Sequence, residues 1–101
     1  MTIEINTEEN TALCSLNPRI YPLDVVLSAA YGFLDRAYIL IDGEPAEEII
    51  IELRAREADK AEALLREFLN EVVRYAVYAD QAAKNKDVRA AIHQKALRDM
   101  Q

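Results

Sequence analysis

The stretch "AYILIDGEPAEEIIIELR", residues 37–54, decides the fold of this chain. It contains two β-branched, apolar runs that are separated by the polar segment "DGEPAE". Asp42 and Gly43 supply turn chemistry, and Pro45 prevents a single continuous strand. The stretch therefore predicts a β-hairpin. Its three consecutive isoleucines, Ile49 to Ile51, indicate a second strand that is covered on both faces over part of its length.

A second hairpin is expected upstream of this stretch. The segments "TIEIN" (residues 2–6) and "TALCSLN" (residues 11–17) both alternate apolar and polar side chains. The four residues between them, "TEEN", are polar and favour a turn. Ile3 and Ile5 then lie on one face of the first strand. The pattern predicts two short strands, each buried on one side.

A helix is predicted between the two hairpins. The segment "NPRIYP", residues 17–22, interrupts the strand pattern with two prolines, and Pro22 suits the first turn of a helix. The next residues follow helical spacing and predict a helix of about a dozen residues with one apolar face. The expected apolar positions are Leu23, Val26, Leu27, Ala30, Tyr31 and Leu34.

From Asp59 onward the apolar residues again recur with helical spacing. Asp59 is a candidate N-cap, and Glu62 three residues later completes a capping-box pattern. The segment "KNKD", residues 84–87, interrupts the apolar face, so a separate, loosely attached last helix is expected over about 86–98; the pattern leaves open that the helix from Asp59 continues through this segment. The resulting order is ββαββαα. We predict one α+β domain over residues 1–101, with the helices on one face of a mostly antiparallel sheet.

Composition and charge narrow the possible environments. Cys14 is the only cysteine, so the chain forms no internal disulfide, which fits a reducing compartment. The segment "MTIEINTEEN" is unlike a signal peptide, and no apolar run approaches the ~20 residues of a membrane span. We expect a cytoplasmic protein that does not bind membranes. The net charge of −6 argues against nucleic acid as a partner.

The charge is unevenly distributed along the chain. Residues 79–101 contain five Lys or Arg and three Asp, whereas residues 1–78 contain seven basic and fifteen acidic residues. A basic tail could dock on an acidic partner. It could equally be a solvated helix face with balancing charge.

No arrangement of residues typical of catalysis is present in the sequence. His93 is the only histidine, and a metal site needs several ligands. Ser15 and Ser28 lie outside any nucleophile-elbow pattern, and no glycine-rich loop could cradle a phosphate. We therefore expect no enzyme activity, no metal and no cofactor.

The tyrosines are the best candidates for an interaction surface. Tyrosine suits the rim of a core and also a protein interface, because it combines a large ring with a hydroxyl group. Arg36 could bind the last carbonyls of the first helix or pair with an acid of the sheet. We expect any interaction surface to use Tyr21, Tyr31, Asp35, Arg36, Tyr38, Asn70, Tyr75 and Arg89.

Three segments together resemble a known family. They are "IYPLDVVLSAAYGFLDRAY" (residues 20–38), "FLNEVVRYAV" (68–77) and "VRAAIHQKAL" (88–97), with a hairpin between the first and the second. In order and spacing they are similar to the His-Xaa-Ser system protein HxsD family, over roughly residues 16–97.

The resemblance implies an accessory role in peptide maturation. In such systems two radical S-adenosylmethionine proteins accompany a precursor rich in His-Xaa-Ser repeats, and this chain lacks the cysteine triad of an iron–sulfur cluster. The expected partners are therefore a maturase or the precursor peptide. An exposed strand, "TIEIN" or "EIIIEL", could accept that peptide as an extra strand.

The alternative is a homodimeric structural domain without a peptide-binding role. Val73 and Val77 lie off the main apolar stripe of the long helix, so they could face another copy of the chain.

Overall fold

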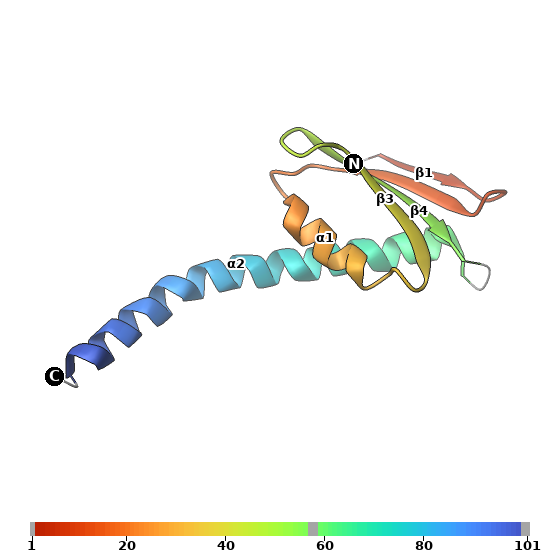
Figure 1. The fold of residues 1–101 in the computed structure, drawn as a ribbon. Helices are drawn as coiled ribbons and strands as arrows, with labels where there is room; N and C mark the ends of the chain where they lie inside the picture. The colour runs from red at the N-terminus through yellow and green to blue at the C-terminus, as the bar shows by residue number, and fades with distance from the viewer. Residues whose placement is uncertain (1, 57–58, 100–101) are drawn as a thin grey trace.

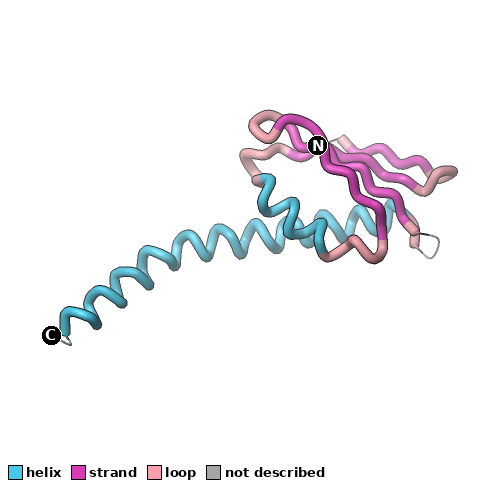
Figure 2. Tube along the Cα trace, in the orientation of Figure 1, coloured by secondary structure: helices cyan, strands magenta, loops and turns pink. Residues whose placement is uncertain are grey.

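The computed structural model describes residues 2–56 and 59–99, with side chains described as far as Lys84. It is an α+β fold, as predicted, with one four-stranded sheet and both helices on the same side of it (Figure 1, Figure 2). The elements are β1 (Ile3–Asn6), β2 (Thr11–Leu16), α1 (Leu23–Tyr31), β3 (Ala37–Glu44), β4 (Glu48–Ala55) and α2 (Ala61–Asp99).

The sheet has the strand order β1-β2-β4-β3, and every neighbouring pair is antiparallel. Both predicted hairpins are confirmed. The chain leaves β2, passes through α1 and returns as β3, with β4 lying between these two strands. Consequently β1 and β3 form the two edges. The expectation that "EIIIEL" could be an exposed edge is wrong, because β4 is paired on both sides.

The core lies between the sheet and the two helices. Residues at alternate positions of β2 and β4 point toward the helices and are buried. On the opposite face of β4, Ile50 is only half-buried, because no helix covers that face. The buried apolar residues of β2 and β4 are Ala12, Cys14, Leu16, Ile49, Ile51, Leu53 and Ala55.

The buried face of α1 is rotated from the predicted one. Val25, Val26, Ala29 and Ala30 are buried, whereas Leu27 and Leu34 are 50% and 51% exposed. The small Ala29 and Ala30 side chains suit a close approach between the two helices. Phe33, just beyond α1, then reaches Phe68 of α2, and their rings meet edge to face with centroids 5.8 Å apart.

The two helices expected after residue 59 form one continuous helix, α2. The segment "KNKD" contains neither glycine nor proline, and its residues cost only a few tenths of a kcal/mol each in a helix. Lys84 also pairs with Asp80 one turn earlier, with Nζ 2.9 Å from Oδ2. This i, i+4 pair favours the helix through the interruption.

α2 has two parts in different environments. We call Ala61–Ala76 the packed half, because it carries buried residues from Ala61 to Val72, and Val77–Asp99 the projecting half (Figure 1). Residues 77–84 are all exposed. The Cα radius of gyration is 18.2 Å, whereas a compact chain of this length has about 13 Å. The projecting half accounts for this elongated shape.

Candidate functional site

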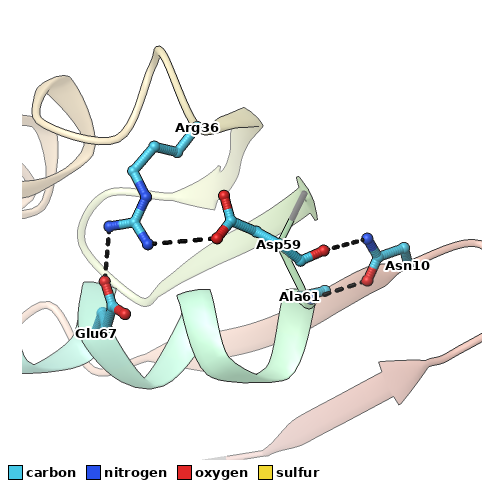
Figure 3. A network of polar contacts seen from close by, with 5 residues as sticks. All are labelled: Asn10, Arg36, Asp59, Ala61 and Glu67. Atoms are coloured by element: carbon cyan, nitrogen blue, oxygen red, sulfur yellow. Dashed lines mark hydrogen bonds and ion pairs between the residues drawn. The ribbon is translucent and has the colours of Figure 1, made fainter. Parts of the chain in front are cut away.

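The turn between β1 and β2 is attached to the start of α2 by one side chain (Figure 3). The Asn10 Nδ2 donates to the carbonyl oxygen of Asp59 at 2.8 Å, and the Ala61 N–H donates to Asn10 Oδ1 at 2.9 Å. Asn10 has a φ of 54°, in the left-handed region that asparagine tolerates better than most residues. A residue distant in sequence therefore caps α2.

The predicted capping box does not form. The carboxylate of Asp59 lies 3.6 Å from Arg36 Nη2, and Glu62 pairs with Arg66 at 2.8 Å. Both acids thus have other partners, while Asn10 supplies the cap. The prediction failed because nothing in local spacing indicates that the β1–β2 turn reaches the start of α2.

Arg36 connects the segment before β3 to α2. Its Nη1 donates to Glu67 Oε2 at 2.7 Å, and its guanidinium lies 5.6 Å from the centre of the Phe33 ring. The hydrogen bond with Glu67 raises the pKa of Arg36 above its ordinary value. Its acidic partners are Glu67 of α2 and Asp59, two residues before α2 begins, rather than the last carbonyls of α1 or an acid of the sheet, the two partners expected from the sequence. Arg36 therefore serves chiefly to position β3 against the helix.

The free edge of β1 presents unpaired backbone groups. The Ser15 N–H donates to the Thr2 carbonyl at 3.2 Å, and hydrogen-bonded pairs alternate along an antiparallel ladder. Given the observed register, Glu4 and Asn6 direct their backbone groups toward β2. Ile3 and Ile5 therefore direct their N–H and C=O groups toward the free edge.

The side chains of Ile3 and Ile5 extend the apolar inner face of the sheet but are incompletely covered. They are 47% and 37% exposed, because α2 packs across β2 and β4. A shallow hollow lies where β1 and its turn meet the start of α2. Its lining residues are Ile5, Asn6, Thr7, Asn10, Lys60, Ala61 and Glu62.

The electrostatic character of this edge is acidic. The segment 2–10 contains Glu4, Glu8 and Glu9 and no basic residue. Glu62 lines the hollow, where Lys60 is the basic lining residue. A strand added beside β1 would therefore contact an apolar surface that is surrounded by glutamate side chains.

The residues predicted from sequence to interact are spread over several elements. Tyr21 is half-buried against the core, whereas Tyr31 is 80% exposed on α1. Asp35 and Asn70 are exposed. Arg89 belongs to α2, but its side chain lies outside the described ones, as does that of His93.

Two of the predicted tyrosines have aromatic or cationic neighbours. The guanidinium of Arg56 lies 4.5 Å from the centre of the Tyr38 ring on the open side of the sheet. The rings of Tyr75 and Tyr78 meet edge to face, with centroids 6.3 Å apart. Use of these tyrosines in an interface stays a prediction.

Sequence reasoning missed the contribution of Asn10 and Glu67. The local signal for Asn10 was its place at the end of a polar turn, where asparagine often adopts a left-handed conformation. Glu67 carried no signal, because it occupies an ordinary exposed helix position.

Cys14 is fully buried, and burial raises the pKa of its thiol to about 11. The thiolate is the nucleophilic form of cysteine, so this side chain is inert near neutral pH. Within the part of the chain that the structure describes, no group of three or more His, Cys, Asp or Glu could hold a metal ion. No helix in that part is long and apolar enough to cross a membrane.

A protein-family model matches most of this chain. The family model described as His-Xaa-Ser system protein HxsD matches residues 16–101. Neither the curated proteins nor the solved structures contain a significant match. The matched region runs from the end of β2 through α2 and so includes most of the fold. This chain therefore belongs to the His-Xaa-Ser system protein HxsD family.

Proposed function

We propose that this protein is a non-catalytic accessory protein of a His-Xaa-Ser system, and that it holds an extended precursor peptide along the free edge of β1. Membership of the HxsD family supports a role in a His-Xaa-Ser system. The chemical modification would then belong to the radical S-adenosylmethionine partners that the family resemblance implies. The partner and the peptide-binding role are proposals.

The observation that carries this proposal is the unpaired edge of β1. An extended peptide could donate to and accept from the backbone groups of Ile3 and Ile5, extending the sheet by one strand. Its inward side chains would cover the exposed parts of these two isoleucines. The peptide would thus gain main-chain hydrogen bonds and apolar contact together.

The chemistry of a His-Xaa-Ser triplet suits this edge. Side chains two residues apart lie on the same face of an extended strand, so the histidine and the serine of one triplet would point the same way. A protonated imidazole would be attracted by Glu4, Glu8 and Glu9. Peptide binding should therefore be stronger when the histidine is protonated.

A role in binding rather than in chemistry is supported by Cys14. It is the only thiol, and its burial and raised pKa leave it protonated and inaccessible at neutral pH. A covalent intermediate on this thiol would require the core to open.

The test is calorimetric titration of the protein with a synthetic peptide that contains two His-Xaa-Ser triplets. Ile5→Pro removes an edge N–H while the bonds from Glu4 and Asn6 to β2 remain. We expect about tenfold weaker binding for Ile5→Pro, since one hydrogen bond contributes about 1 kcal/mol and proline also hinders the added strand. Ile5→Val, which keeps the N–H and most of the apolar surface, is the matched control and should bind normally.

The same titration tests the charge argument. Affinity should fall as the pH rises through the histidine pKa of about 6.5, because the imidazole loses its charge while the glutamates remain ionised. A peptide with alanine in place of histidine should lose this pH dependence. Equal binding by Ile5→Pro and the wild type would remove strand addition at β1 as the mechanism.

A further inference from the structure

The second edge of the sheet, β3, differs from β1 in length and character. β3 has eight residues and pairs with β4 at every position without a bulge. Its first five residues, Ala37 to Ile41, carry no charge and no proline. Edge strands of monomeric proteins are usually short, charged or bulged, because an open apolar edge pairs readily with another strand. β3 lacks these protections over more than half of its length.

The pairing of β3 with β4 determines which β3 residues direct their backbone groups toward the free edge. The Arg56 N–H donates to the Arg36 carbonyl at 3.2 Å, and these positions continue the observed register. Tyr38, Leu40 and Asp42 therefore direct their backbone groups toward β4. Ile39 and Ile41 direct both their N–H and their C=O groups toward the free edge. At the two ends of the strand, the Ala37 N–H donates to the Phe33 carbonyl at 2.9 Å and the Gly43 N–H donates to Asp42 Oδ1 at 2.8 Å.

We propose that β3 pairs with β3 of a second copy of this chain, antiparallel and with Leu40 on the two-fold axis, to form a continuous eight-stranded sheet. A two-fold axis requires an isologous contact, in which the same strand faces itself. Placing Leu40 on the axis pairs Ile39 with Ile41 of the other copy, and Ala37 with Gly43. Ile39 and Ile41 of each β3 then use both their N–H and their C=O groups, which gives four hydrogen bonds across the axis.

The side chains are self-complementary in this arrangement. Leu40, which is 60% exposed, meets its own copy at a non-hydrogen-bonded position, where cross-strand side chains approach most closely. Shifting the axis by one residue to Ile41 would instead place Leu40 opposite Asp42. The axis at Leu40 therefore matches apolar with apolar side chains.

A polar contact flanks the apolar centre. With Leu40 on the axis, Asp42 of one copy lies opposite Tyr38 of the other. Tyr38 already has the Arg56 guanidinium over its ring, with Nη1 3.5 Å from the hydroxyl oxygen. The carboxylate of Asp42 would thus approach a hydroxyl donor and a positive charge at each end of the interface. This charge complementarity favours a second copy of the chain over an unrelated strand.

The test is the molar mass in solution, measured by sedimentation equilibrium over a concentration series. We compare the wild type with Leu40→Lys, which places two like charges across the axis, and with Leu27→Lys on α1. Both leucines are at least half exposed, at 60% and 50%, so neither change should unfold the protein, and circular dichroism verifies this. We expect a dimer for the wild type and Leu27→Lys, and a monomer for Leu40→Lys.

Each other outcome overturns the proposal. A monomeric wild type at all concentrations excludes the dimer, and a dimeric Leu40→Lys excludes this interface. A Val77→Lys variant tests the alternative, a dimer that forms through α2. If this variant is monomeric, the second copy binds at α2 instead of β3. Peptide binding at β1 is measured in a separate titration. A Leu40→Lys variant that is monomeric should therefore still bind the His-Xaa-Ser peptide normally.

Discussion

The packed and projecting halves of α2 belong to one unbroken helix but have opposite surroundings. In the packed half, Phe68 is fully buried and meets Phe33 edge to face at 5.8 Å. Just beyond this half, Tyr78 meets Tyr75 with nearly the same geometry at 6.3 Å, yet Tyr78 is 58% exposed. The two aromatic pairs therefore differ mainly in whether water surrounds them.

This difference separates helix formation from core formation. Helix propensity and the Asp80–Lys84 pair support the projecting half, whereas the packed half is also held by the sheet and α1. We expect the free energy of unfolding to depend on the packed half almost alone.

The strongest test of the comparison is truncation of the two matched aromatic residues. Phe68→Ala should lower the free energy of unfolding by about 3–5 kcal/mol, because it leaves a cavity in the core. Tyr78→Ala should change it by less than about 0.5 kcal/mol, as is usual for exposed positions. Urea denaturation followed by circular dichroism measures both, and similar losses would show that the projecting half also packs.

The next largest effect concerns the core that the packed half covers. Burial raises the pKa of Cys14 from an ordinary value of 9.0 to about 11. The thiol then ionises in the unfolded chain before it does in the folded one, so stability is fully present below pH 9 and falls as the pH rises toward 11. The total loss should be roughly 2–3 kcal/mol, since one pKa unit corresponds to about 1.4 kcal/mol.

Urea denaturation of the wild type and Cys14→Ala at a series of pH values from 8 upward isolates this contribution. The variant removes the thiol, so its stability should fall less steeply over the same interval. Parallel curves for the two proteins would mean that other groups control the alkaline loss.

A smaller effect is expected where the packed half begins. Asn10→Ala removes the acceptor of the Ala61 N–H and places alanine at a left-handed φ. It should cost about 1–2 kcal/mol, the usual cost of losing an N-cap. Asn10→Gly loses the same side-chain bonds but tolerates this backbone conformation, so it should cost less than alanine.

Asn70→Ala provides the control, because Asn70 is an exposed asparagine within α2, the helix that Asn10 caps. Thermal unfolding of the three variants ranks their stabilities. Equal melting temperatures for Asn10→Ala and Asn70→Ala would contradict the capping role.

Much of the fold could be predicted because its signals are local. The β3–β4 hairpin follows from β-branched runs around Asp42 and Gly43, and the φ of +102° at Gly43 shows why glycine stands there. A Cβ at this position would lie 2.3 Å from the carbonyl oxygen of Glu48. The packed face of α2 follows from regular spacing between Leu64 and Val72.

The remaining features depend on contacts between distant segments. In α1, Leu27 and Ala30 satisfy the same periodic pattern, and only the position of α2 decides that the smaller residue is buried. The insertion of β4 between β2 and β3, which makes β3 an edge, also has no local signal. The prediction of interaction residues also lacked a local signal, because exposure and edge position are properties of the assembled sheet.

The position of β4 has a consequence for the order in which the chain folds. The β3–β4 hairpin closes through a short turn, which is a fast event. The pairing of β2 with β4 joins residues distant in sequence, such as Leu16 and Ile49, so it can form only after β4 has been made. During synthesis the β1–β2 hairpin leaves the ribosome before β4 and α2, so Ala12, Cys14 and Leu16 are still uncovered. The core closes only after the packed half has been made, so the apolar face of β2 stays exposed until about sixty further residues have been synthesised.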